Sequence, residues 1–411
     1  MLGNLRVDGS RLWSTIEASA RIGATQRGGL RRLALTSEDG AMRSLFRGWC
    51  DASRYSVSTD AIGNVFAFRS GDDPSAPVVL IGSHLDTQIK GGRYDGVLGV
   101  LAGLEVLRTL DDRGIRTRAS VAIVNWTNEE GARFEPPLLG SAVMTGRMSV
   151  ADARARRDAA GISVGEALDQ LGEAGTFVLP AECIDSYFEL HIEQGPRLYE
   201  SGVEIGVVTG AFHVRGMVVA IAGQCAHVGP TPMKDRRNAL VAAARLAAAL
   251  DDIGFIFAGT GGKSTTMRIA VEPNLLGIIP DMANITCDLR HPEAAGAEEM
   301  FRLFRQEVQK VEEKTGCSIS ISETWTYGGL SFDAACVATV RNAARELGLT
   351  SCDMLTEAGH DAMHLATRVP SGMIFVACEN GLSHNEAESC TAADAERGAN
   401  VLLRAVLSRA L

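Results

Sequence analysis

The stretch VVLIGSHL (78–85), followed by DGVLGVLAGLEVLRTL (95–110), decides the expected fold of this 411-residue chain. The first segment is rich in β-branched residues and begins after Pro77, as is typical of a strand. The second segment has apolar residues at helical spacing, namely Val97, Val100, Leu101, Leu104 and Leu107. A strand followed directly by such a helix is typical of α/β proteins.

Three further apolar segments continue this pattern along the chain. ASVAIVNW (119–126), SYFELHI (186–192) and GMIFVAC (372–378) each predict a strand. Strands that are separated by helices favour a layered α/β fold with a mostly parallel sheet. We therefore expect this fold for the larger part of the chain.

The central part of the chain has a different order of elements. Six segments predict, in turn, strand, helix, strand, strand, helix and strand: 214–223, 235–254, 265–273, 283–291, 295–316 and 318–325. This β-α-β-β-α-β order is the split βαβ pattern of a small α+β sandwich. Because it interrupts the longer α/β pattern, it indicates an inserted domain.

The length of the chain also favours two or more domains, since single cores seldom grow to this size. We expect residues 1–210 and 329–411 to form one domain and residues 211–328 to form the inserted domain. The predicted hinges lie near Gly210 and at Gly328–Gly329.

Composition excludes several classes of partner and compartment. A formal net charge of -10 argues against nucleic-acid binding, which requires clustered Lys and Arg. The nine cysteines are dispersed without a C-x-x-C pair, as is typical of reduced thiols. MLGNLRVDGSRLW (1–13) lacks the apolar core of a signal peptide, and no segment has the ~20 apolar residues of a membrane helix. We expect a cytoplasmic protein.

Histidines and carboxylates stand where the predicted strands run out into loops. They are His84 with Asp86, Asp95, Glu129 with Glu130, His191 with Glu193, and His384. In open α/β sheets, ligands bind beyond the carboxyl ends of the strands. Groups that are distant in the sequence are therefore expected to converge at one edge of the sheet.

Each of these residues also has a plainer interpretation. Asp95 can cap the helix that follows it, the histidines can be satisfied core residues, and Glu129–Glu130 can lie in a solvated loop. Several buried charges at one sheet edge, however, are costly unless they are paired or bind a cation. Imidazole and carboxylate ligands together suit zinc, manganese, cobalt or nickel. Taken jointly, the residues predict a metal site.

Three histidines and two carboxylates are more ligands than a single ion needs. Two ions that share Asp95 as a bridge fit better, and such pairs lie ~3.5–4 Å apart with a nucleophilic water between them. Glu129 is then available as the general base, since adjacent carboxylates do not both easily reach one ion. Asp86 is a candidate acceptor that fixes the tautomer of the His84 imidazole.

Six segments carry a resemblance to a known family. They are SHLDTQIKGGRYDGVLGVLAGLEVL, TNEEGARFEPPLLGSAVMTG, ELHIEQGPRLYESG, GQCAHVGPTPM, AGHDAMHLA and GMIFVACENGLSHNEAE. They closely resemble the amidase and carbamoylase branch of the dimetal M20 peptidase superfamily. The resemblance covers the chain from about residue 63 to residue 391, and NEEGARF and HIEQGP are its most specific parts.

The resemblance implies a role for each matching residue. The metal ligands of the family match His84, Asp95, Glu130, His191 and His384, with Asp95 as the bridge. Glu129 matches the catalytic base, which takes a proton from water and passes it to the leaving nitrogen. Gln194 matches an amide that contacts substrate, although a glutamine after a strand is often a surface group.

Two further matches lie in the inserted domain. His227 matches a lid histidine that polarises the scissile carbonyl, although a histidine on a glycine-rich turn can be structural. Arg290 matches the arginine that pairs bidentately with the substrate carboxylate; its plainer interpretation is a solvated ion pair on a strand. The lid domain of the family also builds a homodimer, so His227 is expected to serve the partner subunit's site.

The chain departs from the family pattern at two places near the expected substrate pocket. Gly277 stands where the family commonly has an asparagine, and Asn274 and Asn284 are nearby candidates to replace it. Thr356-Glu357-Ala358 stands where the family often has Ser-Gly-Ala. These departures leave the metal chemistry intact and leave the identity of the substrate open.

We expect hydrolysis of an N-carbamoyl-L-amino acid to the amino acid, carbon dioxide and ammonia, with two divalent ions of zinc, manganese, cobalt or nickel. An allantoate or ureidoglycolate amidohydrolase is the closest alternative, since the same residues serve it. An aminoacylase or dipeptidase fits HIEQGP less well. A non-catalytic ligand-binding relative is disfavoured because Glu129 and all the candidate ligands are present.

Overall fold

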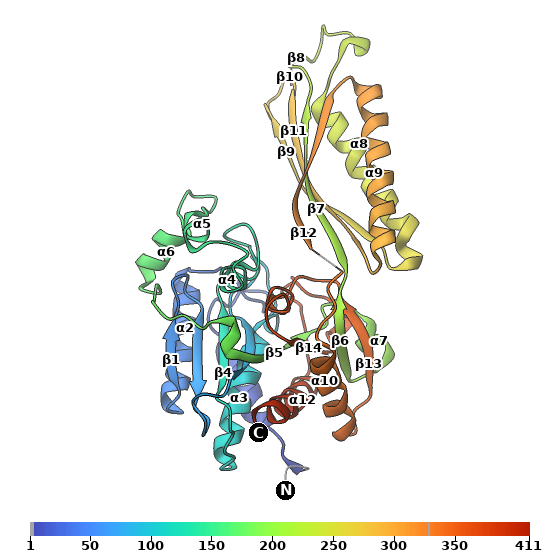
Figure 1. The fold of residues 1–411 in the computed structure, drawn as a ribbon. Helices are drawn as coiled ribbons and strands as arrows, with labels where there is room; N and C mark the ends of the chain where they lie inside the picture. Colours follow the sequence, from blue (N-terminus) through green and yellow to red (C-terminus); the bar gives the residue numbers. More distant parts are fainter. Residues whose placement is uncertain (1–3, 328) are drawn as a thin grey trace. The chain divides into compact units, whose positions relative to one another are not determined.

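The chain folds into two compact units. The computed structural model describes residues 4–327 and 329–411. Unit 1 comprises Met1–Thr209 and Phe332–Leu411, and unit 2 comprises Gly210–Ser331 (Figure 1). Gly210 pairs with Ser331 in an isolated antiparallel bridge, so the two chain segments that enter unit 2 lie side by side. Gly328, part of a predicted hinge, lies outside the described residues.

Unit 1 is built on an eight-stranded sheet with the order β1-β2-β4-β3-β5-β14-β6-β13. The strands are β1 (Ser56–Thr59), β2 (Val65–Arg69), β3 (Val78–His84), β4 (Val121–Trp126), β5 (Ile184–Ile192), β6 (Ile205–Ala211), β13 (Ser351–Thr356) and β14 (Ser371–Val376). The four central strands β4, β3, β5 and β14 are mutually parallel. The pairs β1–β2, β2–β4 and β14–β6 are antiparallel. The predicted α/β fold with a mostly parallel central sheet is confirmed.

Long helices pack against the central strands. The helices of unit 1 are α1 (Gly9–Ser19), α2 (Ser37–Ala52), α3 (Val97–Asp112), α4 (Leu139–Met144), α5 (Val150–Ala155), α6 (Val164–Leu171), α7 (Arg197–Ser201), α10 (Ala334–Glu346), α11 (Asp361–Leu365) and α12 (Ala392–Ala410). Helices α3 and α12 contact each other and β3 and β5. Since β4 is buried along its whole length and β3 in all but its first residue, their apolar runs serve the core.

The predicted central strands overlap β3, β4, β5 and β14, but four outer strands were not predicted. Strand β1 has the sequence SVST and no buried residue, so it lacks the apolar run of a central strand. The other unpredicted strands are β2, β6 and β13. Outer strands show weaker patterns because tertiary pairing, rather than local sequence, fixes them.

Unit 2 is a four-stranded antiparallel sheet with the order β12-β7-β11-β9, packed against two helices (Figure 1). Its elements are β7 (His213–Ala222), α8 (Ala239–Phe257), β9 (Lys263–Glu272), β11 (Met282–His291), α9 (Ala294–Thr315) and β12 (Ser318–Tyr327). Each overlaps one of the six predicted segments, in the predicted order. A short pair, β8 (Ala226–His227) and β10 (Ile278–Ile279), was not predicted.

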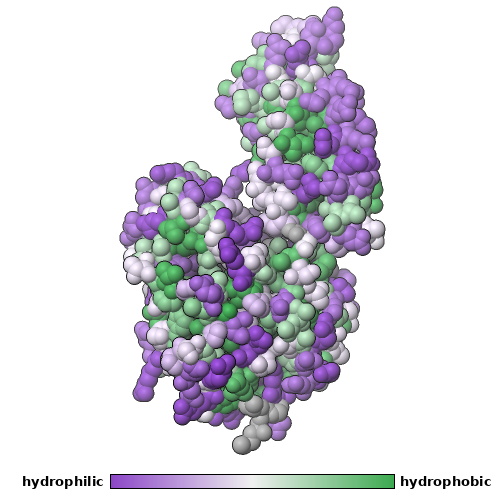
Figure 2. Space-filling model, in the orientation of Figure 1, coloured by the Kyte–Doolittle hydropathy of each residue, from purple (hydrophilic) through white to green (hydrophobic). Residues whose placement is uncertain are grey.

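The core of unit 2 lies between the sheet and its helices. Alternate residues of β11 point into it, together with residues of β7, α8 and α9: Ala283, Ile285, Cys287, Leu289, Met217, Val219, Leu246, Met300 and Phe304. The remaining β11 side chains, including Asp288 and Arg290, therefore lie on the other face of the sheet. In Figure 2 the α9 side of unit 2 is largely hydrophilic.

Within residues 4–327 and 329–411, no helix is both long and apolar enough to cross a bilayer.

Candidate metal centre

The candidate residues of unit 1 gather at one edge of the parallel sheet. His84 is the last residue of β3, and His191 is the next-to-last residue of β5. Glu129–Glu130 and His384 follow β4 and β14. Since these four strands are parallel, their carboxyl ends meet at the same edge. The predicted convergence of distant segments is therefore present in the fold.

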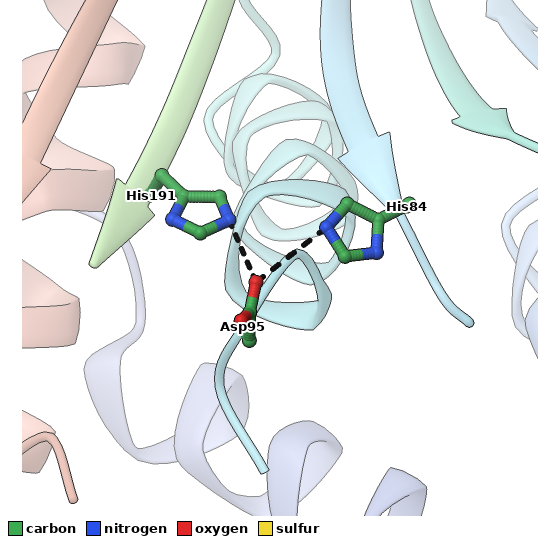
Figure 3. Close-up of side chains that lie close together, drawn as sticks. All are labelled: His84, Asp95 and His191. Atoms are coloured by element: carbon green, nitrogen blue, oxygen red, sulfur yellow. Dashed lines mark ion pairs between the residues drawn. The ribbon is translucent and has the colours of Figure 1, made fainter. Parts of the chain in front are cut away.

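The first cluster consists of His84, Asp95 and His191 (Figure 3). The Nε2 atoms of His84 and His191 lie 3.6 and 3.1 Å from Oδ1 of Asp95. All three side chains are at most 5% exposed. The two imidazoles approach one carboxylate oxygen from different strands, an arrangement that can hold one cation.

The second cluster shares Asp95 with the first. Nε2 of His384 lies 3.3 Å from Oδ2 of Asp95 and 3.3 Å from Oε2 of Glu130. Asp95 thus turns one oxygen toward each cluster, which is the placement that a bridging carboxylate requires. In each cluster the potential ligand atoms lie within 4.8 Å of one another.

The hydrogen bonds of the histidines fit metal ligation. Nδ1 of His84 lies 3.0 Å from the backbone oxygen of Asp86, and Nδ1 of His191 lies 2.9 Å from the backbone oxygen of Ile192. When Nδ1 carries the proton of the neutral ring, Nε2 keeps its lone pair. The backbone N–H of Gly96 donates to Nε2 of His191 at 3.0 Å, in agreement with this tautomer. The imidazole nitrogens and carboxylate oxygens of the two clusters therefore fit two divalent cations.

Gly96 has a steric reason to lie between Asp95 and α3. Its φ is +68°, and a Cβ there would lie 2.3 Å from the His84 ring. A side chain at this position is excluded both by the left-handed backbone and by the imidazole. Gly96, not Asp95, is the N-cap residue of α3 and makes no side-chain cap. The plainer interpretation of Asp95 as a helix cap is therefore wrong.

The pKa values express the strong negative potential of the site. Burial lowers the pKa of His84, but Glu129 and Asp95 outweigh this effect and raise it well above its ordinary value. Burial likewise opposes the rise of the His384 pKa, which reaches about 9 through its contact with Asp95. Burial raises the pKa of Glu130 to about 7. Without a metal the clusters bind protons, as expected where carboxylates crowd together.

Glu129 lies beside the first cluster. Its Oε2 is 3.4 Å from Nε2 of His84, and the residue is 6% exposed. Burial, with Asp361 and Glu130 nearby, raises the Glu129 pKa well above its ordinary value. A carboxylate with a raised pKa is suited to accept a proton and to release it again.

Asp86 supports both the histidine and the acidic pair, through different atoms. Its carboxylate accepts the backbone N–H groups of Glu129 and Glu130, each at 3.3 Å. The carboxylate is 3.8 Å from Nδ1 of His84, whereas the Asp86 backbone oxygen is 3.0 Å away. The backbone oxygen of Asp86 is thus a closer acceptor for the imidazole than its carboxylate.

Asn128 shapes the loop that carries Glu129 and Glu130. Its φ of +57° lies in the left-handed region, where asparagine is tolerated better than most residues. Its amide donates to the backbone oxygen of Phe134 at 2.8 Å and accepts from the N–H of the same residue at 3.3 Å. Asn128 was not among the predicted site residues, although its place in NEEGARF was available as a signal.

Gln194 contacts the shared carboxylate. Its Nε2 donates to Oδ2 of Asp95 at 2.8 Å and to Oγ of Ser383 at 3.3 Å. Its Oε1 is buried and has no hydrogen-bond partner among the described residues. Because Nε2 is already engaged, Oε1 is the atom of Gln194 that is available for the expected contact with substrate.

His227 and Arg290 belong to unit 2. His227 is exposed in β8, and its Nδ1 accepts the backbone N–H of Gly229 at 3.0 Å. Nε2 of the neutral ring therefore carries the proton and can donate it in a hydrogen bond. Arg290 donates from Nε and Nη2 to Oδ2 of the buried Asp288 at 2.8 and 2.6 Å.

Gly277 lies next to His227, because Val228 N–H donates to its oxygen at 3.3 Å and β10 begins at the following residue. A Cβ at Gly277 would meet nothing within 4 Å, although its φ is +85°. The candidate replacements Asn274 and Asn284 are both exposed. The position thus has room for the asparagine of the family, but it lacks a side chain here.

Comparison with known proteins agrees with this geometry. Residues 80–408 match the profile of peptidase family M20/M25/M40. The chain belongs to this family. It is 40% identical over 407 residues to an N-carbamoyl-L-amino-acid amidohydrolase of Rhizobium meliloti, with 99% of this chain and 98% of the relative covered. It is 33% identical to the allantoate amidohydrolase of Bacillus subtilis, with 94% of each covered.

Solved structures extend the M20 relationship to the whole fold. An amidase of the hydantoinase/carbamoylase family from Burkholderia vietnamiensis superposes with a TM-score of 0.94 at 44% identity, over 99% of this chain and 98% of that one. The predicted resemblance to the M20 superfamily and its amidohydrolase branch is confirmed. Hydrolases of this family are generally dimetal enzymes, and two candidate clusters are present here.

Proposed function

We propose that this protein hydrolyses the carbamoyl C–N bond of an N-carbamoyl-L-amino acid, giving the amino acid, carbon dioxide and ammonia. The observation that carries the proposal is the Asp95 carboxylate, whose two oxygens face two histidine-containing clusters. Several relatives that match over nearly their whole length are amidohydrolases of N-carbamoyl-L-amino acids.

Two divalent cations would be held by side chains of unit 1. His84, His191 and Asp95 would hold one, and Asp95, Glu130 and His384 the other. When bound, such ions polarise the substrate carbonyl and lower the pKa of water. The mixed imidazole and carboxylate ligands suit zinc, manganese, cobalt or nickel.

Glu129 moves the proton in the proposed reaction. Its Oε2, beside the first cluster, accepts a proton from the attacking water as the water oxygen bonds to the carbamoyl carbon. The same carboxylic acid then gives that proton to the nitrogen that leaves when the C–N bond breaks. The raised pKa of Glu129, caused mainly by burial, favours both the uptake and the release of this proton. Asp86 holds the loop of this base through the two backbone N–H groups.

Three further residues would bind the substrate. Gln194 offers its buried Oε1 to an N–H of the carbamoyl group. His227 would donate from Nε2 to the scissile carbonyl, since Nδ1 already accepts from Gly229. Arg290, oriented by Asp288, would pair with the substrate carboxylate.

We further propose a homodimer formed through unit 2, in which His227 serves the partner subunit. Strand β9 is an edge of the four-stranded sheet and carries Met267 and Ile269, which are 48% and 40% exposed. Exposed edge strands are ready sites for pairing with a second copy. Light scattering of the purified protein checks this, and a monomer that retains full activity would contradict it.

The reduced state expected of the nine free cysteines supports a cytoplasmic location.

An allantoate or ureidoglycolate amidohydrolase is the second candidate. Relatives with these names match over at least 94% of this chain, and the same clusters would serve them. Gly277 and Glu357, which depart from the family pattern, are the positions that favour a changed substrate.

Ammonia release separates the candidates. The metal-stripped protein is supplied with manganese, cobalt, nickel or zinc and offered a panel of N-carbamoyl-L-amino acids, allantoate and ureidoglycolate. We expect the highest kcat/KM with a carbamoyl amino acid. A higher kcat/KM with either ureido acid would overturn the first proposal in favour of the second, and no release from any of them would overturn both.

A further inference from the structure

Two polar residues of the segment SHNEAE (383–388) have no part in the reaction described above. They are Ser383 and Glu388. Glu388 is 5% exposed, although it carries a carboxylate. A buried carboxylate is costly unless its oxygens accept hydrogen bonds, so the partners of Glu388 indicate what it stabilises.

Glu388 joins two loops that carry candidate metal ligands. Its Oε1 accepts the backbone N–H groups of Tyr94 and Asp95 at 3.0 and 3.1 Å. Its Oε2 accepts the hydroxyl of Ser383 at 2.9 Å. The loop of Asp95 and the loop of His384 are distant in the sequence, and this carboxylate ties them together.

The packing around Glu388 leaves little freedom to its carboxylate. A Cβ on Gly92 would lie 2.0 Å from Cδ and Oε1 of Glu388. Gly92, which has no side chain, therefore leaves room for the Glu388 carboxylate beside the Asp95 loop. A shorter or differently shaped side chain at position 388 would lose contacts on both sides.

Ser383 extends the connection to the ligand and to the substrate-binding amide. Its Oγ is 3.2 Å from Oδ2 of Asp95 and accepts from Nε2 of Gln194 at 3.3 Å. The Ser383 hydroxyl has one hydrogen, which points to Glu388 because that contact is the shorter one. The Ser383 oxygen can therefore accept a hydrogen bond from Gln194.

This arrangement fixes how the Gln194 amide is turned. Asp95 and the Ser383 oxygen both act as acceptors, and Nε2 of Gln194 donates to each of them. The opposite orientation would place the amide carbonyl against the Asp95 carboxylate. Oε1 of Gln194 is thereby directed away from Asp95, as an acceptor for a donor group.

We propose that Glu388, through Ser383 and the backbone of Asp95, is a positioning residue that holds the Asp95 carboxylate and the Gln194 amide for metal and substrate. The inference rests on the proposed function, because it requires a metal centre at Asp95. It adds to that function a residue that binds neither substrate nor metal. Groups that orient metal ligands typically change metal affinity by about 10- to 100-fold when they are replaced.

The test compares Glu388→Gln with Glu379→Gln in the full chain. The amide introduced by Glu388→Gln keeps an oxygen for the two backbone N–H groups but offers an N–H to Ser383 in place of an acceptor. Glu379 is exposed and lies in the same segment after β14, so its variant is the matched control. Calorimetric titration of the chelator-stripped protein with Mn²⁺ gives the Kd, and thermal melting of the same preparation gives the metal-free Tm.

We expect Glu388→Gln to raise the Kd for Mn²⁺ by about 10- to 100-fold, while the metal-free Tm stays close to that of the unaltered protein. Glu379→Gln should change neither quantity. Ser383→Ala should raise KM more than it lowers kcat, because the Gln194 amide loses one of its acceptors.

Two outcomes would overturn the inference alone. In the first, the Kd of Glu388→Gln equals that of the unaltered protein. In the second, Glu379→Gln raises the Kd as much as Glu388→Gln does, which would show that the effect is not specific to Glu388. If the unaltered protein itself bound no Mn²⁺, Zn²⁺, Co²⁺ or Ni²⁺, the proposed metal centre would fail and the inference with it.

Discussion

The candidate residues of the two units differ in how firmly the fold holds them. In unit 1, Asp95 is buried and within hydrogen-bonding distance of groups from two other segments of the chain, those of His191–Gln194 and Ser383. In unit 2, His227 is exposed, and its ring accepts a hydrogen bond from Gly229, a close neighbour in the sequence. The candidate groups of unit 1 are therefore preorganised for chemistry, whereas those of unit 2 are suited to binding. Substitutions in unit 1 should therefore lower kcat or metal affinity, whereas substitutions in unit 2 should mainly raise KM.

Removal of metal should have the largest effect and should be confined to unit 1. We expect chelation to abolish ammonia release, and added divalent ions to restore it. Because a ligand stabilises the state that binds it, hydrogen exchange should accelerate in β3 and β5 but not in β7 and β11. Equal acceleration of exchange in both units would contradict the assignment of the metal site to unit 1. Full activity after chelation would show that the reaction needs no metal.

Glu129→Gln tests whether the chemistry of unit 1 depends on a single proton-accepting atom. The isosteric amide cannot take a proton, so kcat should fall by about 10²- to 10⁴-fold, while the Kd for Mn²⁺ changes little. Steady-state kinetics and calorimetry measure the two quantities. Near-normal turnover would show that another group is the base.

Arg290→Ala tests the expectation that unit 2 contributes binding. The KM for a carbamoyl amino acid should rise about 10- to 100-fold, corresponding to roughly 1.4–2.7 kcal/mol, with a smaller change in kcat. Arg302→Ala is the control, because the Arg302 guanidinium also pairs with a carboxylate, that of Glu299, but on α9. A loss confined to kcat would place Arg290 with the chemistry of unit 1.

His364 offers a smaller, pH-dependent test of how firmly unit 1 holds its polar groups. Burial, with Arg147 nearby, lowers the pKa of His364 to about 4, and its Nδ1 lies 3.0 Å from Oγ of Ser141. Since the folded pKa is below the unfolded value, the stabilisation is present above pH ~6.5 and is lost as the pH falls toward 4. The contribution of His364 to the free energy of unfolding should decrease by about 2 kcal/mol between pH 7 and pH 5.

Urea unfolding of the unaltered protein and of His364→Asn at both pH values measures this contribution. The variant keeps a polar group for Ser141 but does not titrate, so its stability should decline less on acidification. An equal decline in both proteins would show that His364 is as accessible to protons when folded as when unfolded.

Much of this architecture could be predicted because its signals are local. The apolar runs of β3 and β5 and the helical spacing in α3 specify their elements without reference to distant residues. The polar residues at the strand ends could likewise be assigned to one sheet edge. Strand β1, with no buried residue, carries no comparable signal.

The support of the site could not be predicted, because it consists of contacts between distant segments. Glu388 meets Asp95 across 293 residues, and nothing in the spacing of the chain indicates that contact. Asp86 could be predicted as the acceptor for His84, but the sequence does not indicate that its backbone oxygen, rather than its carboxylate, is the closer atom. Local sequence thus predicts which side chains gather, and tertiary packing decides which atoms face one another.

The contact between Gly96 and the His84 ring has a practical consequence for directed evolution. Random libraries that diversify Gly92 or Gly96 will consist mostly of inactive clones, since a side chain at either position collides with Glu388 or with the His84 ring. Positions 274–277 and 357 are better targets for altering substrate preference. At Gly277 a side chain encounters open space, but the backbone φ of +85° favours glycine, or asparagine over most other residues, so diversity there is best limited to such residues.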